Sequence, residues 1–237
     1  EHNVIVGGFT LSAGLLANRN TALDGKFRLY PGVDVSYRPN DEWKVYASWN
    51  RALRVPTYTD LYTNNAVQQG DIALRPEKNE AFKVGTRYRT HGFEALLSGF
   101  YSKGTDIIDW VYPTAESKKY QAMNIGKLDN MGYSVDAALH LQELLPEFFI
   151  TRIKAGYAFI HQKHSTDGDV YGSLYALEYL RHKATLQVDH RIWRQFSASW
   201  ALRWQERMNG YHPYTKVDVR LQWTAPTYNI YVKADNI

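Results

Sequence analysis

Apolar and polar residues alternate one by one along many stretches of this chain. In KVDVRLQW, residues 216–223, every second side chain is apolar and those between are polar. The stretches WKVYASWN (43–50), FSASWALRWQ (196–205) and YNIYVKAD (228–235) repeat the pattern. Because side chains two residues apart lie on the same face of a β-strand, this period predicts strands with one apolar and one polar face.

The predicted strands are long. Most have at least the roughly 9–11 residues that a tilted strand needs to cross a bilayer, whereas strands of soluble proteins peak near about 5–6 residues. The fold class expected is therefore all-β, an antiparallel up-and-down transmembrane β-barrel segment of about eleven strands. These strands are residues 4–17, 27–38, 43–53, 80–90, 93–103, 131–142, 148–161, 180–192, 196–206, 214–223 and 228–237.

The connections between these strands alternate between short and long. Short ones such as PNDE (39–42), THG (90–92) and RQ (194–195) alternate with long ones such as residues 54–78 and 109–130. Consecutive antiparallel strands place alternate connections at opposite ends, so all short turns are expected at one rim and all long loops at the other. This asymmetry is typical of outer-membrane barrels.

Aromatic residues flank the short turns, which indicates an interfacial aromatic belt at that rim. Chance is the alternative explanation, since aromatic residues make up 14% of the chain. The residues concerned are Trp43, Tyr88, Phe93, Phe148, Phe149, Trp193, Phe196, Trp223 and Tyr228.

The two faces of the predicted strands are expected to meet different surroundings. Charged side chains would be costly in a dry barrel interior, so the polar face requires a wide lumen that is wet or filled by protein. Residues expected to point to the lumen are Lys44, Arg203, Arg220 and Lys233. Residues expected to point outward to lipid are Trp43, Trp49, Trp200, Val219, Trp223 and Ile230.

Composition narrows the partners further. The net charge of +4 is spread along the chain without a basic block, so nucleic acid is not an expected partner. The absence of Cys excludes a disulfide framework and thiolate metal sites. No run of 18 apolar residues predicts a membrane-spanning helix. Eleven is an odd number, whereas single-chain bacterial barrels have even numbers of strands, so the chain is expected to be part of a larger barrel.

Several motifs resemble the C-terminal barrel strands of TonB-dependent outer-membrane receptors. They are RALRVPTYTDLY (51–62), ALRPEKNEAFKVGTRY (73–88), GFYSKGTDIIDWV (99–111), NIGKLDNMGYSVDAAL (124–139) and YVKADNI (231–237). In that family the stretch from Arg54 to Tyr62 ends a strand, a long outer loop follows, and Leu74 to Lys78 opens the descending strand. The resemblance covers essentially the whole chain and implies about 11 strands of a 22-stranded barrel. Residues 1–237 would be its C-terminal part, with the plug domain and the final strand outside them.

The late strands are most similar to those of vitamin B12 (cobalamin) receptors, through YALEYLRHKATLQVDHRIW (175–193) and SASWALRWQERMNGYHPY (197–214). This resemblance implies uptake of cobalamin across the outer membrane of a Gram-negative bacterium, powered through TonB. The implied partners are the nutrient, the protein's own plug domain, TonB acting through that plug, the lipid bilayer and a surface-exposed lipoprotein that captures substrate. No cofactor is implied.

Tyrosines are concentrated in the long loops, where rigid rings with a polar tip suit the capture of a large, partly apolar ligand. Packing of one loop on another explains them equally well. No catalytic motif is present and catalysis is not expected. His161 and His164 have no third ligand near them in sequence, so no metal site is expected either. The candidate substrate-binding residues are Tyr58, Tyr62, Tyr112, Tyr120, Tyr171, Tyr175 and Tyr211.

Three alternatives remain open at this point. Siderophore and haem receptors share the commoner motifs of the family. A passive porin-like barrel would have the same wall without the plug. A soluble β-sandwich binding module would also be rich in alternating strands.

Overall fold

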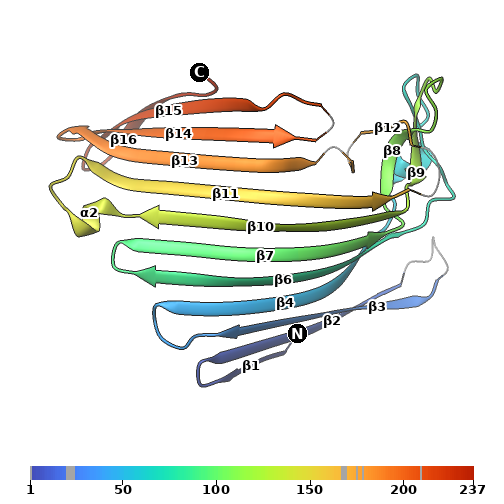
Figure 1. Cartoon of the computed structure of the whole chain (residues 1–237), viewed down its shortest axis with the longest axis horizontal. Helices are drawn as coiled ribbons and strands as arrows, with labels where there is room; N and C mark the ends of the chain where they lie inside the picture. Colours follow the sequence, from blue (N-terminus) through green and yellow to red (C-terminus); the bar gives the residue numbers. More distant parts are fainter. Residues whose placement is uncertain (1, 20–24, 167–169, 175, 178, 209) are drawn as a thin grey trace.

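Within the described residues, twelve strands form one sheet in which each strand pairs with the next strand of that sheet along the chain, always antiparallel (Figure 1). The computed structural model describes residues 2–19, 25–166, 170–174, 176–177, 179–208 and 210–237. The strands of the sheet are β1 (His2–Val6), β2 (Phe9–Arg19), β3 (Phe27–Tyr37), β4 (Trp43–Arg54), β6 (Glu77–Thr90), β7 (Phe93–Thr105), β10 (Lys127–Leu139), β11 (Ile150–Ser165), β13 (Leu180–Trp193), β14 (Phe196–Arg207), β15 (Tyr214–Thr224) and β16 (Asn229–Ala234).

Ten of the eleven predicted strands correspond one to one to strands of this sheet. The exception is residues 4–17, which fold as two strands because Gly7 and Gly8 form a tight turn between β1 and β2. Gly7 has a φ of +56°, a conformation that glycine adopts without steric cost. The expected odd number of strands is therefore wrong for this sheet, which has twelve within the described residues. That the plug domain and the final strand lie outside residues 1–237 stays a prediction.

The short and long connections lie at opposite rims, as predicted. In Figure 1 the short turns are on the left and the long loops are on the right. One short connection contains the single-turn helix α2 (Leu141–Leu144). Among the described residues, neither helix has the length or apolar character required to cross a membrane. Within those same residues β1 pairs only with β2 and β16 only with β15, so the sheet is open.

Strand register separates the two faces of the sheet as predicted. Lys44 pairs with Arg87, and successive partners across the sheet lead to Arg203 on the same face. Arg220 and Lys233 are paired on that face too, which we call the polar face. The opposite, apolar face carries all the residues predicted to point outward: Trp43, Trp49, Trp200, Val219, Trp223 and Ile230.

The aromatic residues at the short-turn rim contact one another across strands. Trp43 and Tyr88 have ring centroids 4.7 Å apart, and Tyr88 is 6.2 Å from Phe93. Phe196 lies 6.3 Å from Trp223, which contacts Tyr228 at 5.5 Å. These contacts form separate aromatic groups along the short-turn rim, which we call the aromatic belt, the arrangement found where barrels meet a membrane interface.

Candidate functional site: three long loops fold into one module

Three long connections fold together at the long-loop rim. They contribute the helix α1 (Tyr58–Tyr62) and the strands β5 (Gln68–Gln69), β8 (Ile108–Tyr112), β9 (Tyr120–Asn124) and β12 (Gly172–Ser173). The strands form a second sheet in the order β12-β8-β9-β5, which stands upright beside the ends of the large sheet in Figure 1. We call these elements and the residues that join them the loop module.

The loop module departs from the all-antiparallel pairing predicted for the chain. Gln68 and Gln69 of β5 pair in parallel with Tyr120 and Gln121 of β9. This pair is confined to two residues and lies outside the large sheet. Parallel pairing is possible here because the two strands come from different loops and are joined by the intervening strands of the wall.

Hydrophobic packing holds the loop module together. One cluster consists of Leu74, Ile108, Trp110 and Ala122, drawn from two different loops. A second consists of Ile107, Val111, Ile125 and Leu128, against which Val170 and Leu177 of the third loop pack. Burial of each such large side chain is worth about 1.5–3 kcal/mol. The loops therefore form a small folded unit with a core of its own.

The loop module leans over the polar face of the sheet. Gly104 lies on that face in β7, and a Cβ atom there would come within 2.5 Å of the Ile107 side chain. Leu128, on the same face of β10, is buried in the second cluster. The module thus covers the long-loop end of the surface expected to line the lumen.

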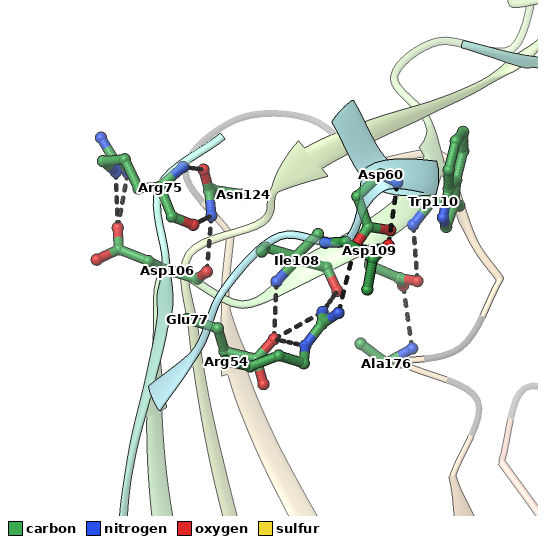
Figure 2. A network of polar contacts seen from close by, with 11 residues as sticks. Arg54, Asp60, Arg75, Glu77, Asp106, Ile108, Asp109, Trp110, Asn124 and Ala176 are labelled. Carbon is green, nitrogen blue, oxygen red and sulfur yellow. Dashed lines mark hydrogen bonds and ion pairs between the residues drawn. The ribbon is translucent and has the colours of Figure 1, made fainter. Parts of the chain in front are cut away.

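Arg54 connects the module to the wall (Figure 2). It is the last residue of β4 and pairs in register with Glu77, the first residue of β6. Its Nη2 is 2.8 Å from Glu77 Oε2 and donates to the carbonyl oxygen of Ile108 at 3.0 Å. Its Nη1 is 3.4 Å from Asp60 Oδ2. One guanidinium therefore bridges two strands of the wall, helix α1 and strand β8.

Asp60 also fixes the start of helix α1. Its Oδ2 accepts hydrogen bonds from the backbone N–H of Thr57 at 2.9 Å and the Thr57 hydroxyl at 2.8 Å. Thr57 Oγ1 accepts in return from the N–H of Asp60 at 3.1 Å. This reciprocal arrangement is a capping box. It is consistent with the burial of Asp60, which is 6% exposed, because a buried carboxylate needs such partners.

Asn124 joins the first two loops to each other. Its Oδ1 accepts from the N–H of Arg75 at 2.8 Å, and its Nδ2 donates to the carbonyl oxygens of Arg75 and Asp106. The Asp106 carboxylate binds the Arg75 guanidinium at 2.8 Å and Lys78 Nζ at 3.4 Å. Figure 2 shows this group beside the contacts of Arg54.

Asp109 ties the third loop to β8 and is 1% exposed. One carboxylate oxygen accepts from the N–H of Trp110 at 2.8 Å. The other accepts from the Ser173 hydroxyl and from the N–H of Ala176 at 3.0 Å. All the buried acids of the module among the described residues thus bind the protein itself. They shape the loops and leave recognition to the groups at the surface.

The candidate tyrosines divide between two settings. Tyr58 and Tyr62 are 80% and 57% exposed, and their rings contact each other at 4.6 Å. Tyr112 and Tyr120 contact at 4.0 Å and are half-buried across β8 and β9. Tyr171 and Tyr211 are exposed on other loops. The prediction for Tyr175 falls outside the described residues.

The histidines considered for metal binding cannot share an ion. His161 and His164 belong to β11, and their spacing of three residues places them on opposite faces of that strand. Within the described part of the chain no group of three His, Asp or Glu side chains could hold a metal.

Sequence reasoning did not single out Arg54, Glu77, Asp106, Asp109 or Asn124. Arg54 and Asp60 were visible only as parts of the strand-end motif, and Glu77 only as part of the motif that follows the loop. Arg54 and Glu77 lie just outside the predicted strands 43–53 and 80–90, so the available signal was only a pair of opposite charges after one strand and before the next.

The chain matches one family model, described as TonB dependent receptor-like, beta-barrel, over residues 5–237. No curated protein matches it. Its fold is similar to that of the FrpB iron transporter from Neisseria meningitidis, with a TM-score of 0.71 and 20% identity over 99% of this chain and 39% of the other. The fold is also similar to that of the siderophore receptor PirA from Pseudomonas aeruginosa, with a TM-score of 0.73 and 17% identity over 99% of this chain and 41% of the other.

The copper transporter OprC gives a TM-score of 0.74 and 17% identity over 98% of this chain and 40% of the other. The chain thus spans about two fifths of the length of the structures that it matches. At these identities the likeness concerns the fold. None of these three structures supports the expected resemblance to cobalamin receptors.

Proposed function

The chain belongs to the TonB-dependent receptor β-barrel family, and from that premise we propose that it forms part of the wall and outer loops of a Gram-negative outer-membrane receptor for energised nutrient uptake. The apolar face contacts lipid and the polar face lines the lumen. The short-turn rim faces the periplasm and the loop module faces the outside. The rest of the barrel and a lumen plug that binds TonB belong to the longer protein of which this chain is a part.

The observation that carries this proposal is the loop module. A passive pore needs no folded unit of loops joined by ion pairs and hydrogen bonds over its mouth. A receptor, in contrast, must hold its binding groups in place before the ligand arrives. Preorganisation lowers the entropic cost of binding. The bridging contacts of Arg54 and the buried Asp109 supply that order in the described loops.

Capture is non-covalent in this proposal. Tyr58 and Tyr62 present two adjacent exposed rings, which offer rigid apolar area and hydroxyl groups to a ligand. No bond of the nutrient is made or broken. Release into the periplasm depends on movement of the plug driven through TonB, and the groups on the polar face provide its contact surface.

The nutrient proposed is a metal complex. The similar structures include an iron transporter, a siderophore receptor and a copper transporter. Because their sequence identity to this chain is low, they support a class of nutrient and not one particular complex. Cobalamin, itself a metal complex, is the second candidate, supported by the likeness of the late strands in residues 175–193 and 197–214. Haem and a substrate-capturing lipoprotein remain alternatives for ligand and partner.

Uptake in a receptor-deficient Gram-negative strain tests the proposal. The full-length receptor containing this chain is expressed with and without functional TonB. Growth is measured with ferric siderophores as the sole iron source and, in a separate auxotroph, with cobalamin as the limiting nutrient. We expect growth on a ferric complex that is saturable and lost without TonB.

Two outcomes redirect or overturn the proposal. Growth on cobalamin alone would select the second candidate. Uptake of the nutrient that persists without TonB, and that rises linearly with nutrient concentration, would identify a passive pore instead. The matched control is Arg54→Ala, which loosens the loop module and leaves the wall in place.

A further inference from the structure

Four lysines gather on the apolar face just below the loop module. Lys78 of β6, Lys103 of β7, Lys127 of β10 and Lys163 of β11 belong to four neighbouring strands. Register places Lys103 level with Asp129 and Lys163, and Lys78 level with Thr105 and Lys127. We call these four residues the lysine grid. They lie on the face that carries Trp49 and Phe82, not on the polar face.

Most of the lysines in the grid form no ion pair within the described residues. Within the described residues, Lys103, Lys127 and Lys163 have no ion pair, and all three are exposed. The nearby Glu80 is already paired with Arg51 at 3.6 Å and accepts from Trp49 Nε1 at 2.8 Å. Asp129 is the remaining acid between the lysines. The grid therefore keeps an excess of positive charge directed away from the sheet.

The lysine grid stands at a definite height above the aromatic belt. About ten residues of β7 separate Phe93 in the belt from Lys103 in the grid. At about 3.3 Å per residue and a tilt of about 40°, the two are roughly 25 Å apart along the membrane normal. This is about the height of the apolar band of outer-membrane barrels. The grid thus lies where the apolar band ends on the loop side.

A groove of about 570 Å³ lies on the same face directly below the grid. Its walls include Phe82, Val84, Tyr101, Met131 and Tyr133, and its floor is at Gly99, which has no side chain. A Cβ atom at Gly99 would meet only ordinary contacts, at 3.8 and 4.0 Å. The groove is therefore open because of the residue at this position. It is apolar along its length, and the register level just above it carries Glu80, Lys103, Asp129 and Lys163.

We propose that the lysine grid and this groove bind one outer-leaflet lipid that carries both phosphate groups and several acyl chains, the chemistry of lipid A. The inference rests on the proposed placement in the outer membrane with the loop module outside. A phosphate accepts charge-assisted hydrogen bonds from Lys103, Lys127 and Lys163. An acyl chain fills the groove over Gly99. Each lysine near a membrane surface adds to the attraction of anionic lipid.

Lipid titration of the purified full-length receptor in detergent tests the proposal. Binding of bisphosphorylated lipid A is followed by native mass spectrometry, with phosphatidylglycerol as an anionic comparator. We expect Lys103→Ala/Lys163→Ala to weaken lipid A binding roughly 25-fold. We expect Gly99→Phe to weaken it without changing folding, because an apolar side chain is tolerated on this face. Wild-type protein should prefer lipid A to phosphatidylglycerol at least tenfold.

The matched control removes the same charge from the polar face. Lys154→Ala/Lys183→Ala should bind lipid A like the wild type, since both lysines lie on the opposite face of the wall. Unchanged binding by the Lys103/Lys163 variant, equal loss in the control, or equal affinity for phosphatidylglycerol would overturn the proposal. Cell fractionation distinguishes this result from failure of the proposed function, because it reports outer-membrane placement independently of lipid affinity.

Discussion

Arg54 and Glu77 face each other where β4 and β6 separate, with Arg54 Nη2 2.8 Å from Glu77 Oε2. This ion pair joins the last pair of residues in register between β4 and β6. The same guanidinium also contacts Asp60 and the carbonyl oxygen of Ile108 in the loop module. The pair is therefore the joint between a membrane-crossing sheet and the loops that it carries. Its position ties the geometry of the candidate binding residues in the loops to the wall.

Replacement of Arg54 by Ala should loosen the module and spare the wall. It removes the hydrogen bonds to Glu77 and to the Ile108 carbonyl and leaves Asp60 without its cation. Because Arg54 is 44% exposed, we expect a modest cost of about 1–3 kcal/mol to loop docking. Hydrogen exchange should rise in residues 57–62 and 107–111.

The control for this change is Arg51→Ala. It removes an exposed arginine three residues earlier in β4, on the opposite face, which binds Glu80 and not the module. It should leave exchange in the loops unchanged. Equal exchange in wild type and Arg54→Ala would contradict the joint assigned to Arg54.

Asp109 should be less tolerant of change than any exposed acid. Asp109→Ala removes the acceptor for Ser173, for the N–H of Ala176 and for the N–H of Trp110. Loss of these partners in a buried site should cost about 2–4 kcal/mol of module stability. Limited proteolysis should then cut within residues 170–177, and Asp109→Asn should be intermediate because it keeps one acceptor oxygen. Cleavage no faster than in Glu116→Ala would count against this role.

The exposed pair Tyr58 and Tyr62 should contribute to ligand affinity. Replacing both with Ala removes two adjacent rings that the fold does not bury, so the protein should remain folded while binding weakens about 5–30-fold. Isothermal titration with the ligand identified by the uptake experiment measures this. Tyr214→Ala, at the start of β15, is the matched control outside the loop module. If binding weakens only in the control, the ligand is held elsewhere.

The apolar face should reject charge. Val219 is near the middle of β15 on that face, and Val219→Arg should cost roughly 2–4 kcal/mol near the bilayer midplane. Ala201→Arg introduces the same side chain on the polar face, opposite Asp218 in register, and should cost less. Folding titrations in lipid vesicles compare the two variants. If Val219→Arg lowers folding stability less than Ala201→Arg does, the assignment of the two faces to lipid and lumen is wrong.

The strands of the wall were predictable because alternation is a local signal repeated over ten or more residues. The turn at Gly7 and Gly8 was missed because apolar residues flank it on both sides, although a Gly-Gly pair is a known hairpin signal. The alternation of apolar and polar residues could not predict the strands of the loop module. Its strands are short, and apolar residues such as Ile108 and Trp110 are buried by partners from other loops.

The joint at Arg54 was hidden for the same reason. Its partners Glu77 and Ile108 are 23 and 54 residues away along the chain, so only the register of the wall brings them together. Local sequence identified exposed tyrosines as candidates, but it could not say which of them contact each other. Tyr58 with Tyr62 and Tyr112 with Tyr120 became pairs only in the folded module.

The 237 residues contain no Cys, so single cysteines can map the orientation of the wall in intact cells. Cysteine is introduced at Tyr58 and Tyr171 in the long loops, at Asn40 and Gln195 in the short turns, and at Val219 on the apolar face. Each variant of the full-length receptor is treated with a membrane-impermeant maleimide. The account predicts labelling from outside at Tyr58 and Tyr171 only, with Asn40 and Gln195 reacting after the outer membrane is opened and Val219 protected by lipid. Labelling of Asn40 or Gln195 in intact cells, with Tyr58 and Tyr171 protected, would contradict it.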